Sequence, residues 1–137
     1  MPRRVIVTAE AAALIGRLKQ QHGPLIFHQS GGCCEGTAPM CFRQRDFRIG
    51  QHDVLLGVIE GCPFYVGEAA FRYWAYIELT IGVVTGGSDS FSLEVADGVR
   101  FVTRSRLFDD AEAAVLDAAE PLPRGPQALA TMTSGGC

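Results

Sequence analysis

The stretch Val5-Ile6-Val7-Thr8, followed by an alanine-rich segment and then by Leu25-Ile26-Phe27-His28, decides how the chain begins to fold. Its first three residues are β-branched and predict a short strand. Thr8 can cap a helix over residues 9–21, in which the larger apolar side chains are spaced to share one face. Gly23 and Pro24 end that helix, because glycine suits a helix C-cap and proline cannot continue the helix. A strand, an amphipathic helix and a second strand are therefore expected.

The second strand leads into a loop rich in cysteine and glycine, His28-Gln29-Ser30-Gly31-Gly32-Cys33-Cys34-Glu35-Gly36-Thr37-Ala38-Pro39-Met40-Cys41. Because glycine lacks a Cβ atom, the backbone at Gly31, Gly32 and Gly36 can approach a bound cofactor closely. Thiols on such a loop are functional more often than thiols buried in a strand. We expect the loop to be the working site. The alternative is that its adjacent cysteines are inert fillers of a tight turn.

The middle of the chain predicts a sheet. Residues 54–60 form a near-continuous apolar strand, which is typical of burial on both faces or of Gly57 lying against a close neighbour. Gly61-Cys62-Pro63 is expected to break this strand, and residues 68–74 could form a short helix. Further strands are predicted at residues 64–66, 76–84, 91–95 and 99–103, with 91–95 as the hairpin partner of 76–84. The fold class is α+β: a single domain with a mainly antiparallel or mixed sheet and one N-terminal helix.

The texture of the sequence changes at residue 109. Residues 109–117 are acidic and alanine-rich and predict a short helix with favourable charge at its N-terminus. Three prolines then interrupt regular structure before a tail that ends in Cys137. We therefore divide the chain into an α+β domain at residues 1–108 and a C-terminal segment at residues 109–137.

Composition restricts the class of protein. The chain has 137 residues, 47% of them hydrophobic and 20% charged, which is typical of a folded domain. A net charge of −3 argues against general nucleic-acid binding, which needs a basic surface. Two arginine-bearing groups, residues 43–48 and 100–106, are most simply interpreted as solvated strand edges, and the alternative is that they form an anion or partner site. No apolar run is long enough for a transmembrane helix, so no membrane association is expected.

The N-terminus also lacks a signal-peptide pattern, which predicts a cytoplasmic protein. Disulfides are rare in that compartment. The five cysteines are therefore interpreted as thiols, metal ligands or redox groups.

The double-cysteine loop, with Phe91-Ser92-Leu93-Glu94 and the segment from Gly98 to Arg106, resembles the DUF779 family over residues 4–108. Members of this family are often labelled acetaldehyde-dehydrogenase-associated. The resemblance implies an association with aldehyde or alcohol oxidation, and an aldehyde dehydrogenase as a partner. It implies no settled activity.

A weaker likeness concerns the order of elements. Thr8-Ala9-Glu10-Ala11-Ala12, a helix, a strand and Ser30-Gly31-Gly32-Cys33 are similar to the opening of A-type iron–sulfur carriers of the HesB kind. Those carriers end in a Cys-Gly-Cys pair, whereas this chain ends in Gly135-Gly136-Cys137. Only Cys33 and Cys137 match the positions of the carriers' cysteines. The likeness implies a HesB-like fold and leaves metal binding open.

Thiolates and imidazoles favour zinc, copper, iron or an iron–sulfur cluster. The pool of candidate metal ligands consists of Cys33, Cys34, Cys41, Cys62, His28, His52 and Cys137. Glu35 could orient an imidazole from outside the metal's coordination shell. We expect an accessory protein, most simply a homo-oligomer, that binds a thiophilic metal or cluster through this loop.

Two other classes of protein stay open. In the first, Cys33 or Cys34 is a catalytic nucleophile and His28 its base, acting on aldehydes or thiol adducts. The sequence places no orienting carboxylate for that base. In the second, the chain is a non-catalytic partner of an aldehyde dehydrogenase. No dinucleotide fingerprint is present, so the chain is not expected to be the dehydrogenase itself.

Overall fold

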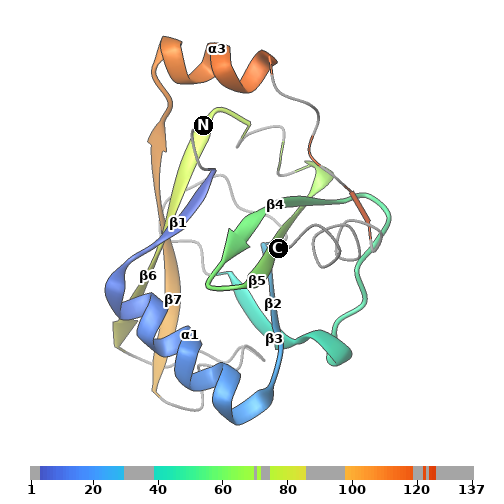
Figure 1. Cartoon of the computed structure of the whole chain (residues 1–137), viewed down its shortest axis with the longest axis vertical. Coiled ribbons are helices and arrows are strands. Elements are labelled where there is room, and N and C mark those ends of the chain that lie inside the picture. Colours follow the sequence, from blue (N-terminus) through green and yellow to red (C-terminus); the bar gives the residue numbers. More distant parts are fainter. Residues whose placement is uncertain are drawn as a thin grey trace.

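The computed structural model describes residues 4–29, 39–69, 71, 75–85, 98–118, 122 and 124–125. This part of the chain is an α+β domain of two mixed sheets and two helices (Figure 1). The strands are β1 (Val5–Val7), β2 (Leu25–Gln29), β3 (Met40–Arg43), β4 (Asp53–Ile59), β5 (Cys62–Gly67), β6 (Ile77–Thr85) and β7 (Val99–Leu107). The helices are α1 (Ala9–His22) and α3 (Asp110–Ala118), and Gln44–Asp46 form a 3-10 turn. The predicted α+β class is confirmed.

The N-terminal strand, helix and strand form as predicted. The side chain of Thr8 accepts a hydrogen bond from the backbone N–H of Ala11 at 3.1 Å, which caps α1. At the other end, Gly23 has a φ of 81°, and its N–H donates to the carbonyl of Lys19 at 2.8 Å. Glycine reaches this positive φ without strain, so the helix ends here, one residue later than expected.

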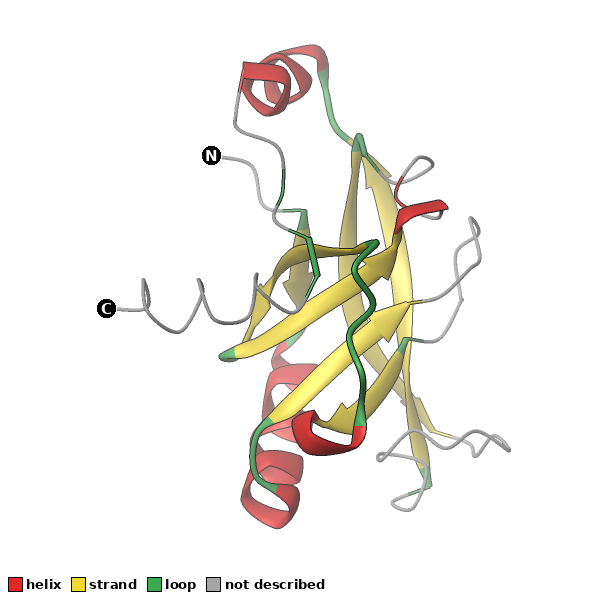
Figure 2. Ribbon diagram, turned by 90° about the vertical axis from the view of Figure 1, so that its right-hand side faces the viewer, coloured by secondary structure: helices red, strands yellow, loops and turns green. Residues whose placement is uncertain are grey.

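The strands form two separate sheets, which face each other in Figure 2. In the first, with order β1-β6-β7, β1 is parallel to β6 and β7 is antiparallel to it. In the second, with order β3-β2-β5-β4, β2 is parallel to β5 while β3 and β4 run antiparallel to their neighbours. The C-terminal ends of β2 and β5 and the N-terminal end of β4 therefore meet at one end of the four-stranded sheet.

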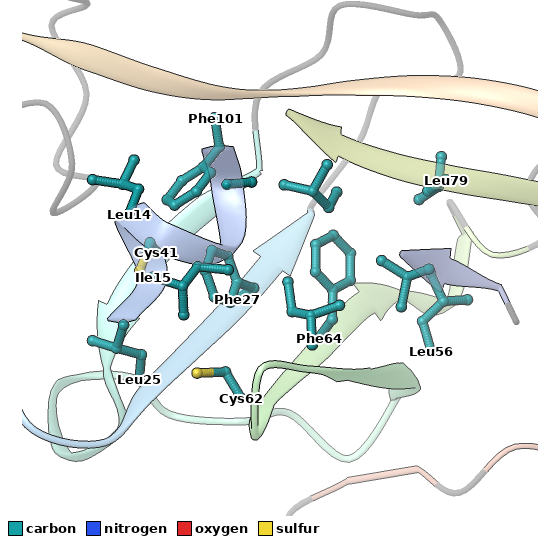
Figure 3. Packing of buried hydrophobic residues seen from close by; sticks show 14 of the residues in the cluster. Leu14, Ile15, Leu25, Phe27, Cys41, Leu56, Cys62, Phe64, Leu79 and Phe101 are labelled. Atoms are coloured by element: carbon teal, nitrogen blue, oxygen red, sulfur yellow. The ribbon is translucent and has the colours of Figure 1, made fainter. Parts of the chain in front are cut away.

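The core lies between the two sheets and α1, as Figure 3 shows. Phe27 of β2 is at its centre and is fully buried. Its ring packs edge-on against Phe101 of β7, with ring centroids 5.2 Å apart, and stacks with Phe64 of β5 at 6.1 Å. The helix contributes Leu14, Ile15 and Leu18, the residues that its spacing placed on one face. The two sheets therefore share one core.

The turn between β4 and β5 differs from the expectation. Glu60 and Gly61 alone form it, with φ angles of 48° and 76°, and the chain is a strand again from Cys62 onward. Positive φ at both central residues is the geometry of a two-residue hairpin loop whose twist matches the strands. The predicted break at Gly61-Cys62-Pro63 was therefore wrong at its last two residues. Their apolar character reflects a buried strand.

The antiparallel partner of β6 is β7. The two strands pair along the full length of β6, from Ile77 with Leu107 to Thr85 with Val99. Residues 91–95, which we expected in that role, lie outside the described residues. Part of the predicted helix at residues 68–74 is also outside them, although Glu68, Ala69 and Phe71 are helical.

Of the two arginine-bearing groups, one follows the prediction. Residues 100–106 lie on β7, the last strand in its sheet. The group at 43–48 does not form a strand edge, because β3 ends at Arg43 and the chain turns at Gln44–Asp46. That turn is held by the N–H of Gln44, which donates to the carbonyl of Pro24 at 3.0 Å.

The acidic helix α3 begins one residue later than the predicted segment and ends one residue later. Asp109 caps it, since its carboxylate accepts from the N–H of Glu112 at 2.8 Å while the carboxylate of Glu112 accepts from the N–H of Asp109 at 3.0 Å. Within the described ranges, no helix is long and apolar enough to cross a membrane.

Candidate functional site

The cysteine loop connects two neighbouring antiparallel strands. His28 near the end of β2 is in register with Met40 at the start of β3, so the loop leaves and re-enters the sheet at adjacent positions. Residues 30–38, which include Gly31, Gly32, Cys33, Cys34 and Gly36, lie outside the described part of the chain, as does Cys137. The geometry of the candidate site is therefore defined by the side chains around the base of this loop.

His28 forms the most specific contact at that base. Its Nε2 lies 3.0 Å from Oδ1 of Asp53, and its side chain is 11% exposed. A carboxylate can only accept at neutral pH, so Nε2 carries the proton and donates it, which leaves the lone pair on Nδ1. Within the described ranges, no hydrogen bond to Nδ1 is seen. In the neutral imidazole, this nitrogen is the one that could bind a metal ion or a proton.

Asp53 is itself held in place. Its Oδ2 accepts from the N–H of Gly50 at 2.8 Å, which closes the turn before β4. Its backbone N–H donates to the carbonyl of Gly50 at 3.1 Å, and its carbonyl accepts from Gly125 at 2.9 Å. These contacts hold the carboxylate in position independently of its contact with the imidazole. Asp53 therefore stands where a carboxylate that orients His28 would be needed, a residue that the sequence did not place.

The face of the sheet around His28 is apolar. Its ring lies against Phe47, with centroids 5.0 Å apart, and Phe47 stacks on Phe42. Ile26 and Tyr65 are buried on the same face. A low-polarity surround strengthens the hydrogen bond between His28 and Asp53 and limits the ring to few orientations.

Cys41 and Cys62 lie on the other face. Cys41 is in register with Phe27, and Cys62 lies two residues before Phe64 on the same face of β5, so both side chains enter the core (Figure 3). Burial raises the pKa of the Cys62 thiol, although Lys19 opposes the shift. The structure does not bring either thiol to His28. Across the described residues, no group of three or more His, Cys, Asp or Glu side chains could hold a metal ion.

The side chain of His52 contacts a different residue from that of its neighbour Asp53. Its side chain is 86% exposed, and Nδ1 lies 3.2 Å from Oε2 of Glu68. The other oxygen of Glu68 accepts from Arg124 at 3.0 Å. His52 and His28 therefore bind different carboxylates. The C-terminal segment that contains Arg124 is anchored beside the site.

Sequence reasoning missed Asp53 because its role depends on register. It stands next to His52 in a turn, and nothing local indicates that β4 will place it near the end of β2. The one available signal was that Asp53 is a carboxylate directly before the apolar strand of residues 54–60.

Two mixed sheets around one core, with a histidine–carboxylate pair at one end, define the chain as a small α+β domain with a polar site. The family model described as "Domain of unknown function (DUF779)" matches residues 14–107, more than half of the chain. The chain therefore belongs to the DUF779 family. No curated protein and no solved structure matches it.

Proposed function

We propose that the protein is a small accessory protein that binds a thiophilic metal ion or an iron–sulfur cluster, and that it serves an aldehyde- or alcohol-oxidising system. The protein ligands in this proposal are the thiolates of Cys33 and Cys34 and the imidazole of His28. The observation that carries it is the contact between His28 and Asp53, 3.0 Å long and on an apolar face.

A histidine that binds a metal usually donates its second ring N–H to a carboxylate or carbonyl. The contact fixes the tautomer and the ring orientation and makes the free nitrogen a better donor. His28 has this arrangement, with Nε2 on Asp53 and Nδ1 left over. Asp53 is held by backbone contacts with Gly50 and Gly125, so the carboxylate that orients the imidazole is itself positioned. These residues fit a metal that prefers nitrogen and sulfur ligands.

The connectivity also supports this ligand set. Cys33 and Cys34 follow His28 by five and six residues, on a loop whose two ends are adjacent in the sheet. Cys137 remains a candidate, because the chain is anchored at Gly125 beside Asp53 and a span of twelve residues reaches up to about 40 Å. Cys41 and Cys62 are left out of the proposed set since both are buried on the opposite face. When bound, the metal would supply Lewis acidity or electron transfer.

A second candidate function, a cysteine-dependent enzyme, is favoured by the same pair. A nucleophilic cysteine needs a base, and that base works best when a carboxylate orients it. In this case Nδ1 of His28 would take the proton of the Cys33 or Cys34 thiol. The thiolate would add to an aldehyde carbonyl carbon, and the resulting alkoxide would take the proton back to give a thiohemiacetal.

Metal content separates the two functions. The full chain, purified anaerobically without added metal, is expected to contain close to one equivalent of a transition metal or cluster. His28→Gln and the Cys33→Ser, Cys34→Ser double variant should lose most of it, while His22→Gln, a control at the end of α1, should retain it. Less than about a tenth of an equivalent in the unmodified chain would contradict metal binding.

The enzyme function has its own test. If metal-free protein formed adducts with aldehydes and lost this activity in Cys33→Ser or Cys34→Ser, the thiol chemistry would replace the metal proposal. If neither metal content nor aldehyde reactivity depended on these cysteines, both functions would be excluded.

A further inference from the structure

A groove lies at the end of α1, at the opposite end of β2 from His28. One hollow, of about 650 Å³, is lined by residues of the α1 C-terminus and of the segment from Arg43 to Arg45. A second, of about 400 Å³, adjoins it and extends to Gly61 and Cys62. The two share Gly23, Pro24 and Gln44. Volumes of this size suit a small molecule.

The groove is cationic in a protein that is acidic overall. Lys19, Arg43 and Arg45 line it together with His22, and among the described residues that line the two hollows there is no aspartate or glutamate. The chain as a whole carries a net charge of −3. Because Arg43 is paired with Asp46, Lys19 and Arg45 supply the positive charge that would attract an anion to this groove.

Most of the polar groups in the groove are already positioned. Gln44 is fixed by its N–H on the carbonyl of Pro24 at 3.0 Å and by its side-chain amide on the carbonyl of Leu25 at 3.1 Å. Nζ of Lys19 donates to the carbonyl of Glu60 at 2.9 Å, which leaves two of its three N–H groups. The side chains of Gln44 and Lys19 would therefore lose little conformational entropy when a ligand binds.

The two cations beside Gln44 differ in their contacts. Arg43 is paired with Asp46, its Nε 2.5 Å from a carboxylate oxygen. Arg45 is exposed and, among the described residues, shows no carboxylate partner. Its guanidinium has a planar set of donors that can bind a carboxylate or a phosphate through two hydrogen bonds. Arg45 is thus the group best able to recognise an anionic head group.

The apolar surface that the groove offers to a ligand is Pro24. This residue is exposed and lines both hollows, whereas Leu25 and Cys62 at the base of the second hollow are 0% and 1% exposed. Pro24 is adjacent to the charged part of the groove. A ligand with one anionic end and a short apolar body would contact both.

We propose that this groove binds a small organic anion, with its carboxylate or phosphate on Arg45 and its apolar part over Pro24. The site is separate from the cysteine loop, since Leu25 and His28 lie at opposite ends of β2. The proposal of an anion site is therefore independent of the proposal of metal binding.

The test uses the full chain, labelled with ¹⁵N, and titrations with sodium hexanoate, hexyl phosphate and the neutral analogue 1-hexanol. We expect saturable shifts of the backbone amides of Gly23, Gln44 and Gly61 with at least one of the two anions and none with hexanol. Whichever anion binds more tightly identifies the head group. No saturable shift with either anion would overturn the proposal.

Two charge-removing variants provide the specificity control. Arg45→Gln should weaken binding roughly tenfold, the loss expected when a charge-assisted hydrogen bond is removed. Arg100→Gln, which removes an exposed arginine of β7, should leave the affinity unchanged. Equal weakening by the two substitutions would show a response to net charge alone and would also overturn the site. Both variants remove exposed side chains, so the fold should be retained.

Discussion

Val5 of β1 lies directly against Gly57 of β4 and thereby joins the two sheets at one point. A Cβ atom added at Gly57 would be 2.8 Å from Cγ1 of Val5, closer than side chains approach one another. Val5 is 4% exposed and belongs to the shared core. The glycine in the middle of an otherwise apolar strand is therefore explained by a contact between sheets, one of the two alternatives that the sequence left open.

Substitution of Gly57 by alanine is expected to destabilise the protein by about 1–3 kcal/mol, the usual result of overpacking a core. Valine is branched at Cβ and has few alternative rotamers, so Val5 has little freedom to move aside. Chemical denaturation of the variant and the unmodified chain measures the change in the free energy of unfolding.

Gly16→Ala is the matched control. Apart from its chain neighbours and the backbone of α1 itself, no atom of the described residues lies within 4 Å of a Cβ built there, and the residue is exposed on α1. Alanine should stabilise the helix by up to about 1 kcal/mol relative to glycine. If the loss at Gly57 is steric, Gly57→Ala should also cost less in a Val5→Ala background. Equal costs in both backgrounds would contradict the contact.

The parts of the fold that could be predicted are those with local signals. Thr8, the apolar face of α1 and Gly23 specify a helix and both of its ends within sixteen residues. The division into two sheets has no such signal, because it depends on β1 pairing with β6, more than seventy residues away. The sequence did not reveal that the β4–β5 turn ends at Gly61. Cys62 and Pro63 resemble a turn sequence but are buried strand residues.

The candidate site divides in the same way. The loop and His28 could be found from residue types alone. Alternation along the strands would have placed the side chains of Cys41 and His28 on opposite faces of the sheet. That conclusion needs the register of β3 against β2, which the sequence does not reveal. Asp53 required the register of β4 against β5 as well.

Cys62 is expected to be unreactive in the folded protein. Burial raises its pKa, so a smaller fraction is thiolate at neutral pH, and its side chain is shielded by the core. Alkylation with iodoacetamide, followed by mass spectrometry of the peptide that contains Cys62, should be at least roughly tenfold slower than in urea-unfolded protein. Equal rates in the two states would show that this end of β5 opens readily.

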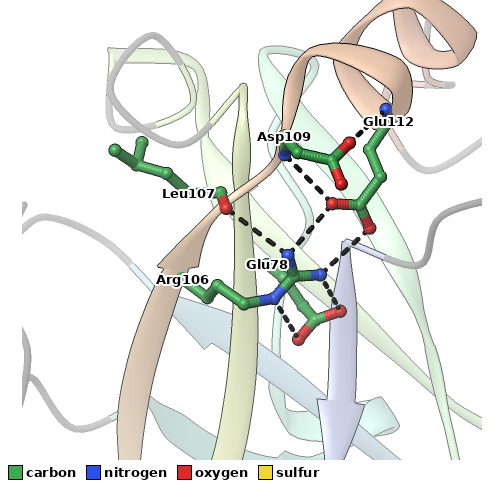
Figure 4. Close-up of polar contacts among 5 residues, drawn as sticks. All are labelled: Glu78, Arg106, Leu107, Asp109 and Glu112. Carbon is green, nitrogen blue, oxygen red and sulfur yellow. Dashed lines mark hydrogen bonds and ion pairs between the residues drawn. The ribbon is translucent and has the colours of Figure 1, made fainter.

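Glu112 provides a pH-dependent contact. Its carboxylate and that of Glu78 both bind Arg106, at 3.0 Å and 3.1 Å, as Figure 4 shows. Hydrogen bonding to Arg106 lowers the pKa of Glu112 from 4.5 to about 2. Because the folded-state pKa is the lower one, the contribution to stability is present above pH 4.5 and is lost as the pH falls toward 2.

The carboxyl ¹³C shift of Glu112 should accordingly titrate well below the ordinary range of glutamate. In Arg106→Gln the midpoint should rise toward about 4.3, the value of an unperturbed glutamate. A midpoint that is the same in both proteins would mean that Arg106 and Glu112 are not paired in solution.

The contact between His28 and Asp53 leads to a prediction about the tautomer. In Asp53→Asn, the side-chain oxygen can keep the bond from the N–H of Gly50, and the NH₂ group then faces Nε2 of His28. Nε2 must become the acceptor, so the proton moves to Nδ1. The lone pair that we assign to a metal would be lost while the shape of the side chain is conserved.

Asp53→Asn should therefore weaken metal binding by about 10–100-fold, the usual effect of changing a carboxylate that orients a ligand. Competition with a chromophoric chelator measures the affinity, and ¹⁵N shifts of the imidazole report the tautomer in the metal-free protein. Glu68→Gln, which alters the partner of His52 instead, is the matched control and should change neither quantity. A tautomer shift with unchanged affinity would remove His28 from the ligand set, because a ligand cannot bind through a nitrogen that keeps its proton.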